Sequence, residues 1–126
     1  MAGGIPDRVG QFIGAHISSV EGLEVLLLLH GQPERWWRHD EIGAELKSVP
    51  ESVALRLADL REHDLVETDA AGAYRFSPAA DAAAVDELRE SYRRRRVAVI
   101  AAIFAEPGDD PAQDFADAFR LRKDVG

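Results

Sequence analysis

The stretch EIGAELKSVPESVALRLADLREHDLVE, residues 41–67, decides the fold that we expect for this chain of 126 residues. Within each half of it, apolar side chains recur at intervals of three or four: Ile42, Leu46, Val53, Leu57 and Leu60. Such spacing gives each of two short helices one apolar face. The turn between them ends in Pro50, a residue that suits the first position of a helix. The stretch therefore predicts two consecutive amphipathic helices joined by a tight turn.

A short β-hairpin is predicted directly after this stretch. Val66 and Thr68 precede the segment Asp69–Gly72, and Tyr74 and Phe76 follow it. Alternating β-formers on both sides of a glycine-containing turn are typical of two paired strands. A two-stranded hairpin is not stable alone in water, so we expect it to lie against the helices.

A central helix is predicted before the stretch. Residues 20–29 are apolar nearly all round, which indicates a helix that is buried on every side. Ser18 and Glu21 have the spacing of a capping box at its start. Gly31 is a suitable residue for its end.

Flanking segments add further helices. Residues 7–17 carry one apolar stripe, and a single long helix is predicted from Asp81 to about Ala105, where its end is apolar all round. After a break at Pro107-Gly108, residues 111–123 have the signals of a short amphipathic helix. The predicted units are an N-terminal helix (1–17), a core (18–78), a long C-terminal helix (79–106) and a tail helix (107–126).

The order of the core elements resembles the winged helix-turn-helix superfamily, most nearly the bacterial transcription regulators of the MarR and ArsR kind. The resemblance covers residues 18–78, in which a helix, a short Trp-containing strand, two helices around a tight turn and a hairpin follow one another. It implies a mainly α fold, a winged helix with a three-helix core and a small β-hairpin wing. One departure is Asp64 in place of the usual Gly, where the last core helix ends in a left-handed conformation that Asp tolerates.

The resemblance also implies a function, that of a cytoplasmic bacterial transcription regulator that binds DNA as a homodimer. In such a protein Ser52 and Arg56 would face the DNA groove, and Arg75 would touch the backbone. The DNA-contacting residues expected on this basis are Lys47, Ser48, Ser52, Arg56 and Arg75. Fold alone does not determine function, so this remains an expectation.

The charge of the core favours an alternative function. The whole chain has 23 acidic and 15 basic residues, a formal net charge of −8. Residues 18–78 contain six basic and twelve acidic residues, and the predicted wing tip, Asp69–Gly72, has no basic residue. Negative charge opposes binding to phosphate. The alternative is therefore an acidic winged helix that contacts a protein partner and no DNA.

A homodimer is expected because the apolar faces of residues 7–17 and 80–105 exceed what one small domain covers. The terminal helices of MarR-like regulators form the dimer interface, so the resemblance implies the same. The interface residues that we expect are Phe12, Ile13, Val99, Ile100 and Ile103. In the tail, Phe115 and Phe119 share one helix face and need a groove, which belongs either to this protein or to a partner protein.

Two aromatic and basic patterns each allow two interpretations. The pair Trp36-Trp37 is either an exposed ligand platform or, as we favour, one ring in the core and one at its edge. The run Arg93–Arg96 circles the helix. These arginines either grip phosphates or, as we favour, pair with acidic neighbours at Asp86, Glu87 and Glu90.

The residue types that the chain contains argue against several classes of function. The chain has no cysteine, so a disulfide framework, a thiolate zinc site and a cysteine nucleophile are excluded. Its four histidines have no metal-binding spacing, and its serines have no hydrolase context, so we expect no enzyme, no metal and no cofactor. Apolar runs such as Val25–Leu29 are far shorter than a membrane span, and the N-terminus does not have the pattern of a secretory signal. We expect a cytoplasmic protein without a membrane partner.

Overall fold

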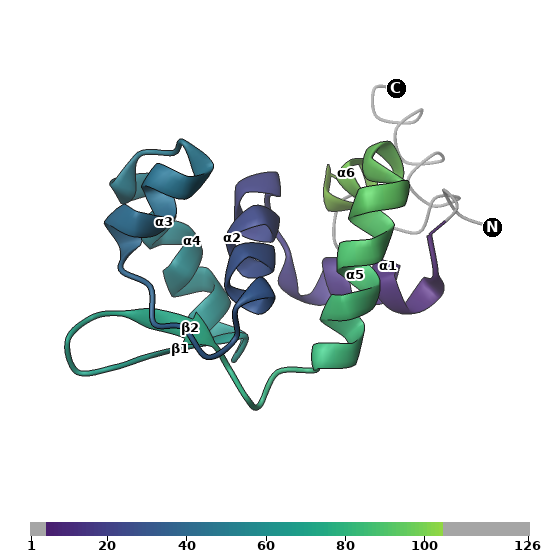
Figure 1. Cartoon of the computed structure of the whole chain (residues 1–126). Helices are drawn as coiled ribbons and strands as arrows, with labels where there is room; N and C mark the ends of the chain where they lie inside the picture. Colours follow the sequence, from purple (N-terminus) through teal and green to yellow (C-terminus); the bar gives the residue numbers. More distant parts are fainter. Residues whose placement is uncertain (1–4, 105–126) are drawn as a thin grey trace, which may run out of the picture.

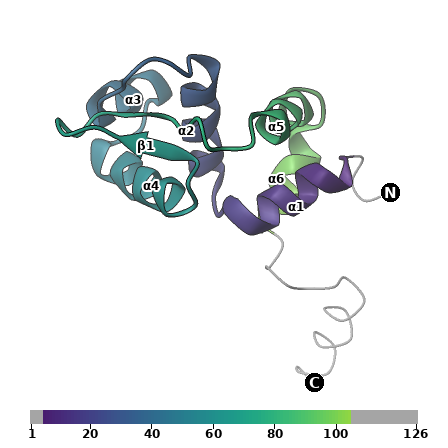
Figure 2. The ribbon, with the colours of Figure 1, turned by 90° about the horizontal axis from the view of Figure 1, so that it is seen from below.

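A computed structural model describes residues 5–104 of the chain (Figure 1). The described part is mainly helical with one small antiparallel sheet, as expected from the sequence. Its elements in chain order are α1 (Asp7–His16), α2 (Val20–Gly31), α3 (His39–Leu46), α4 (Pro50–Glu62), β1 (Val66–Thr68), β2 (Tyr74–Phe76), α5 (Ala82–Arg94) and α6 (Arg96–Phe104). Helix α2 lies between two groups: α3, α4 and the hairpin on one side, and α1, α5 and α6 on the other (Figures 1 and 2).

Helix α2 supplies the centre of the core, as its apolar composition predicts. Leu23, Val25, Leu26 and Leu29 are fully buried, and α2 contacts α3, α4, α5 and β2. The residue that caps it differs from the expected one. The Ser19 hydroxyl, and not that of Ser18, accepts a hydrogen bond of 2.9 Å from the Gly22 backbone N–H. The prediction of a capping box starting at Ser18 was wrong by one residue.

The turn between α3 and α4 is held by a close backbone approach. The Ser48 N–H donates a hydrogen bond of 2.8 Å to the Gly43 carbonyl, and Lys47 adopts a left-handed conformation with φ of 58°. A Cβ atom on Gly43 would lie 2.7 Å from the Ser48 carbonyl oxygen. Glycine is therefore required at position 43 so that the two helices can meet at this angle. Pro50 occupies the first position of α4, as predicted.

The hairpin pairs Val66 with Phe76 and lies against the helices, with contacts from β1 to α4 and from β2 to α2. Asp64 precedes it in the left-handed conformation that was expected, with φ of 61°. At the tip, the Asp69 carboxylate accepts hydrogen bonds from two backbone N–H groups, those of Ala71 and Ala73. The acid at the tip is thus used to form the turn.

The two tryptophans take the roles that we favoured. The backbone N–H and carbonyl of Trp37 each form a 2.7 Å hydrogen bond with Tyr74, which adds a short third segment beside the hairpin. The Trp37 side chain is 2% exposed, whereas that of Trp36 is 37% exposed at the edge of the hairpin. A platform made by both rings is therefore excluded.

The predicted long helix over residues 81–105 was wrong, because the chain breaks it into α5 and α6. The break is at Arg95, whose φ of −133° and ψ of 55° are not helical. The break allows each helix to turn its own apolar side chains into the core: Val85 and Leu88 on α5, and Val99 and Ile103 on α6. Both helices contact α1 and each other, which one straight helix of this length does not allow (Figure 2).

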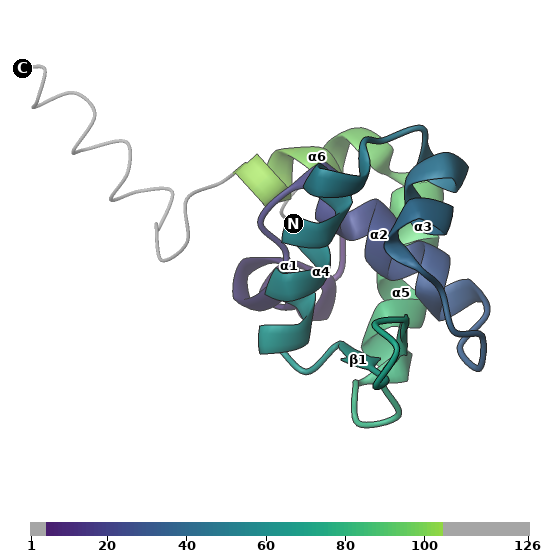
Figure 3. The same ribbon diagram turned by 90° about the vertical axis from the view of Figure 1, so that its left-hand side faces the viewer.

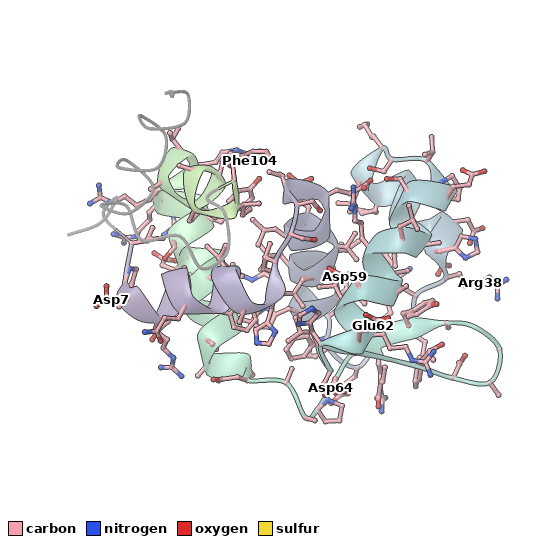
Figure 4. All side chains as sticks on the ribbon, turned by 180° about the vertical axis from the view of Figure 1, so that it is seen from behind. Asp7, Arg38, Asp59, Glu62, Asp64 and Phe104 are labelled. Atoms are coloured by element: carbon pink, nitrogen blue, oxygen red, sulfur yellow. The ribbon has the colours of Figure 1, made fainter. Side chains whose placement is uncertain are left out.

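This packing also covers the residues that were expected to form a dimer interface. Phe12, Ile13, Val99 and Ile103 are at most 7% exposed within the single chain. They are core residues, and the surplus apolar surface was overestimated because α1, α5 and α6 bury their faces against one another. Of the five, only Ile100 is half-buried. The large apolar side chains exposed on α6 are instead Val97, at 81%, and Phe104, at 71%. Figure 4 shows Phe104 on α6.

The close approach at Gly43 leads to a prediction with a matched control. Gly43→Ala should lower the free energy of unfolding by about 1–3 kcal/mol, because the new Cβ atom meets backbone that must move. Gly14→Ala in α1 should raise it by up to ~1 kcal/mol, because that Cβ atom meets open space and alanine favours helix. Urea denaturation of both variants measures the difference. Equal effects of the same sign would contradict this account of the turn.

Candidate binding surface

One side of α4 faces solvent along the whole helix. Its inner positions Val53, Leu57 and Leu60 are buried on α2 and α3, which leaves the opposite positions outside. We call this exposed surface the α4 face, and it consists of Glu51, Ala54, Leu55, Ala58, Arg61 and Glu62. The Leu55 side chain is 67% exposed. Helices α3 and α4 lie side by side at this side of the molecule (Figure 3).

The α4 face continues into a hollow beside the hairpin. This hollow of about 310 Å³ is lined by Ala58, Arg61 and Glu62 of α4 and by Tyr74 of β2. Figure 4 shows Glu62 next to the hairpin, at the C-terminal end of α4. Because Ala58 has only a methyl side chain, the helix and the hairpin leave space between them for a side chain of a binding partner.

Two of the expected DNA contacts, Ser52 and Arg56, point elsewhere. The Glu21 carboxylate at the start of α2 accepts hydrogen bonds from the Ser52 hydroxyl and from Arg56 Nε, the latter at 2.9 Å. All three side chains are partly buried. The hydrogen bond from Ser52, and after it the contact with Arg56, holds the pKa of Glu21 below its usual value. Ser52 and Arg56 therefore lie at the edge of the outer side of α4 that faces α2, where Glu21 binds both.

The remaining expected DNA contacts are scattered. Arg75 on β2 forms an ion pair of 2.5 Å with Glu67 on β1, and its guanidinium carbon lies 4.5 Å from the centroid of the Trp36 ring. Lys47 is exposed in the turn before α4, and Ser48 beside it is half-buried. The structure brings Ser48 and Ser52 together near Glu21, whereas Arg75 is bound to Glu67 on the hairpin.

Three arginines of the run pair with acids, although of the three expected acidic partners only Glu90 is among them. Arg93 and Arg94 both pair with Glu90, and Arg96 lies 3.7 Å from Glu24 of α2. Asp86 has a different partner from the one expected. Its carboxylate lies 2.7 Å from His30 Nε2, which ties α5 to α2.

A histidine pair joins α1 to the end of α4. The Nδ1 atoms of His16 and His63 are 3.1 Å apart, so one ring must donate a proton while the other accepts it. Asp59 is 3.8 Å from His63 Nε2 and accepts a hydrogen bond of 3.2 Å from the Ser18 hydroxyl (Figure 4). Burial, and then the charge of His63, lowers the pKa of His16. The sequence analysis missed this pair because 47 residues separate its members.

In residues 5–104, no group of three or more His, Cys, Asp or Glu side chains is placed to hold a metal ion. Within the same range, residues 5–104, no single helix is both long enough and apolar enough to cross a membrane. Helices α1 and α2 have that length and composition only when taken together, and the pair is bent by 109°. The expected partner-binding residues Phe115 and Phe119 lie outside the described residues.

Comparisons with protein-family models, curated proteins and solved structures find no match for this chain. The resemblance to winged helix regulators therefore stays a prediction that rests on residues 18–78.

The histidine pair predicts how stability depends on pH. The pKa of His16 is lowered in the folded chain from its usual 6.5, so the unfolded chain binds more protons as the pH falls through that value. Stability should therefore decrease from about pH 7.5 to about pH 5.5, a window above the range in which carboxylates such as Glu21 titrate. His30, whose pKa is lowered chiefly by burial, contributes in the same direction.

The share of His16 in this pH dependence is tested by substitution. Between about pH 7.5 and about pH 5.5, the urea midpoint of the His16→Gln variant should decrease less than that of the parent protein. His39→Gln, a change at an exposed position, is the control and should leave the decrease unchanged. If His16→Gln showed the full decrease, the histidine pair would have no part in it.

Proposed function

We propose that residues 18–78 form a winged helix that binds a protein partner through the α4 face and the adjoining hollow. The order of α2, α3, α4 and the hairpin supports the winged helix. So does the tight turn at Gly43 and Ser48, which holds α4 against α3 and leaves its outer side open. The pairing of Trp37 with Tyr74 supplies the short strand that such a fold has beside its wing.

The observation that carries the proposal is the state of the two arginines best suited to DNA. Arg56 is paired with Glu21 and Arg75 with Glu67, both within the same chain. A DNA phosphate that approached either arginine would come close to the carboxylate that already neutralises it. If the phosphate displaced Glu21 from Arg56, Glu21 would remain partly buried, without its cationic partner and close to a polyanion. This makes contact with DNA at this surface unfavourable.

The chemistry of the α4 face suits a protein. Leu55 with Ala54 and Ala58 forms an apolar centre, with Glu51 at one end and Glu62 beside Arg61 at the other. An apolar centre with a charged rim is typical of protein interfaces. The partner expected here presents an apolar side chain to the hollow beside Tyr74 and basic residues to the two glutamates.

A second candidate function is a homodimeric transcription regulator in the bacterial cytoplasm that binds DNA. It is favoured by the exposed position of α4 directly after a tight turn, with Lys47 open to solvent at its start. In this case Arg56 must leave Glu21 to reach a base. A second copy would bind through exposed residues of α6 such as Val97 and Phe104, because the interface first expected is buried within the chain.

One charge-reversal variant separates the two candidates, because they predict effects of opposite sign. Glu51→Lys with Glu62→Lys should weaken binding to a basic protein partner and strengthen binding to DNA. Protein contact is measured by photo-crosslinking in the native host from a photoreactive residue in place of Leu55, with the exposed Ala83 on α5 as the control position. DNA binding is measured by fluorescence anisotropy with random-sequence duplexes at low salt.

The proposal predicts a discrete protein adduct from position 55, none from position 83, and loss of the adduct in the charge-reversed variant. It also predicts no DNA binding by the unmodified chain at low salt, where attraction to phosphate is strongest. DNA binding that weakens steeply with added salt and increases in the charge-reversed variant would reject the protein-partner function in favour of the second candidate.

The second candidate makes its own prediction about Glu21. If the chain binds an operator, Glu21→Gln should raise the affinity because it releases Arg56 from its ion pair. Arg56→Ala should lower the affinity by about 1–3 kcal/mol and relax the sequence preference. Anisotropy titrations at fixed salt measure both, and Arg38→Ala, at an exposed site outside α4, is the control. Equal affinities of the parent, Glu21→Gln and Arg56→Ala proteins would show that this arginine reads no base.

A further inference from the structure

A large apolar groove lies between the first turns of α1 and the middle of α6. We call it the α1–α6 groove, and it has a volume of about 490 Å³. Most of its lining is small or apolar: Ile5, Pro6, Gly10, Ala98, Ala101 and Ala102. It exists because glycine and alanine on the facing sides of the two helices leave the space that larger side chains would fill. The helices that line it, α1 and α6, lie on the other side of α2 from α4 (Figure 1).

The surface of α6 around the groove is also apolar. Val97 is 81% exposed and Phe104 is 71% exposed, and Ala101 between them is exposed as well. Contiguous apolar surface of this kind marks a site that something covers. Asp7, an exposed acidic residue, stands at the rim of the groove.

The chain itself supplies an occupant of matching chemistry. After Phe104, 22 residues follow, and residues 111–123 carry the amphipathic pattern described above, with Phe115 and Phe119 on one face. The six residues 105–110 that precede the pattern span at most about 20 Å when extended. Ala102 of the groove is only two positions before Phe104. The pattern therefore begins within reach of the groove, and the short tether gives it an effective concentration on the order of millimolar.

We propose that residues 111–123 dock as a helix in the α1–α6 groove of their own chain, with Phe115 and Phe119 inside it. The volume is suitable, because a protein cavity of about 150 Å³ holds a benzene ring and this groove is roughly three times larger. Charge complements the fit. The basic residues Arg120, Arg122 and Lys123 follow directly after Phe119, and Asp7 lies at the rim. The proposal does not rest on the proposed function, because its groove and the α4 face share no residue.

The experiment uses the full chain with one cysteine, which is possible without other changes because the natural chain has none. A nitroxide spin label on Asp114→Cys, next to Phe115, should broaden the backbone amide signals of Gly10 and Ala101. The same nitroxide label in a chain that also carries Phe115→Ala and Phe119→Ala is the control and should leave these signals sharp. Contact between two copies is measured in a mixed sample. In it, the observed chain carries the isotope label but no nitroxide, and the second chain carries the nitroxide but no isotope label.

Broadening within one chain that disappears in the double alanine background supports the proposal. Broadening seen only in the mixed sample would overturn it and assign the groove to the tail of a second copy. Absence of broadening at Gly10 and Ala101 in both samples would overturn it as well, and would leave Phe115 and Phe119 to a different protein.

Thermal denaturation gives an independent readout. Phe115→Ala with Phe119→Ala should lower the melting temperature of the full chain by about 5 °C or more. Asp117→Ala, on the opposite side of the predicted tail helix, is the matched control and should change it little. Ala101→Asp places a charge in the groove at an exposed position, so the fold should persist while the broadening from the label is lost. A double alanine variant as stable as the control would contradict docking.

Discussion

The burial of α2 on all sides is the constraint on which the rest of the structure depends. Its leucine and valine side chains need apolar partners in every direction, and α3, α4, α5 and β2 provide them. One group alone would cover only part of the helix. The part made of α3, α4 and the hairpin and the part made of α1, α5 and α6 are therefore held together by a helix that belongs to the core of both.

The ionisable residues of α2 reinforce this arrangement, because they bind side chains of α4 on one side and of α5 on the other. Glu21 holds Ser52 and Arg56 of α4, and Glu24 accepts a hydrogen bond of 3.0 Å from the Tyr92 hydroxyl of α5. His30, at the other end, lies between Asp86 and Arg89 of α5. A charged group on a nearly buried helix has to be paired, and its partners then fix the positions of the neighbouring helices.

The sequence predicted the parts of the fold that depend on local patterns. The spacing of Val53, Leu57 and Leu60 predicts the inner side of α4, and the departure at Asp64 predicts a left-handed helix end. What it did not predict depends on contacts between distant segments. The break at Arg95 follows from the need of α5 and α6 to cover α1, and no local signal marks it. The partners of Arg56 and His16 likewise come from residues 35 and 47 positions away.

The same distinction separates the architecture from the candidate site. Arg56 lies on a helix that follows a tight turn, which is the right place in the sequence for reading DNA. Whether its guanidinium is free to bind DNA depends on which side chain lies opposite it in space. Here the opposite residue is a carboxylate at the start of α2, where negative charge also favours the positive end of the helix dipole. Glu21 therefore stabilises its own helix and neutralises Arg56 at once. Since the pair removes the most suitable cation from the side of α4, the recognition chemistry that remains on that helix is an apolar centre at Leu55 with charged ends, Glu51 at one and Arg61 with Glu62 at the other. This distribution of charge, more than the order of helices and strands, determines which class of partner the surface fits.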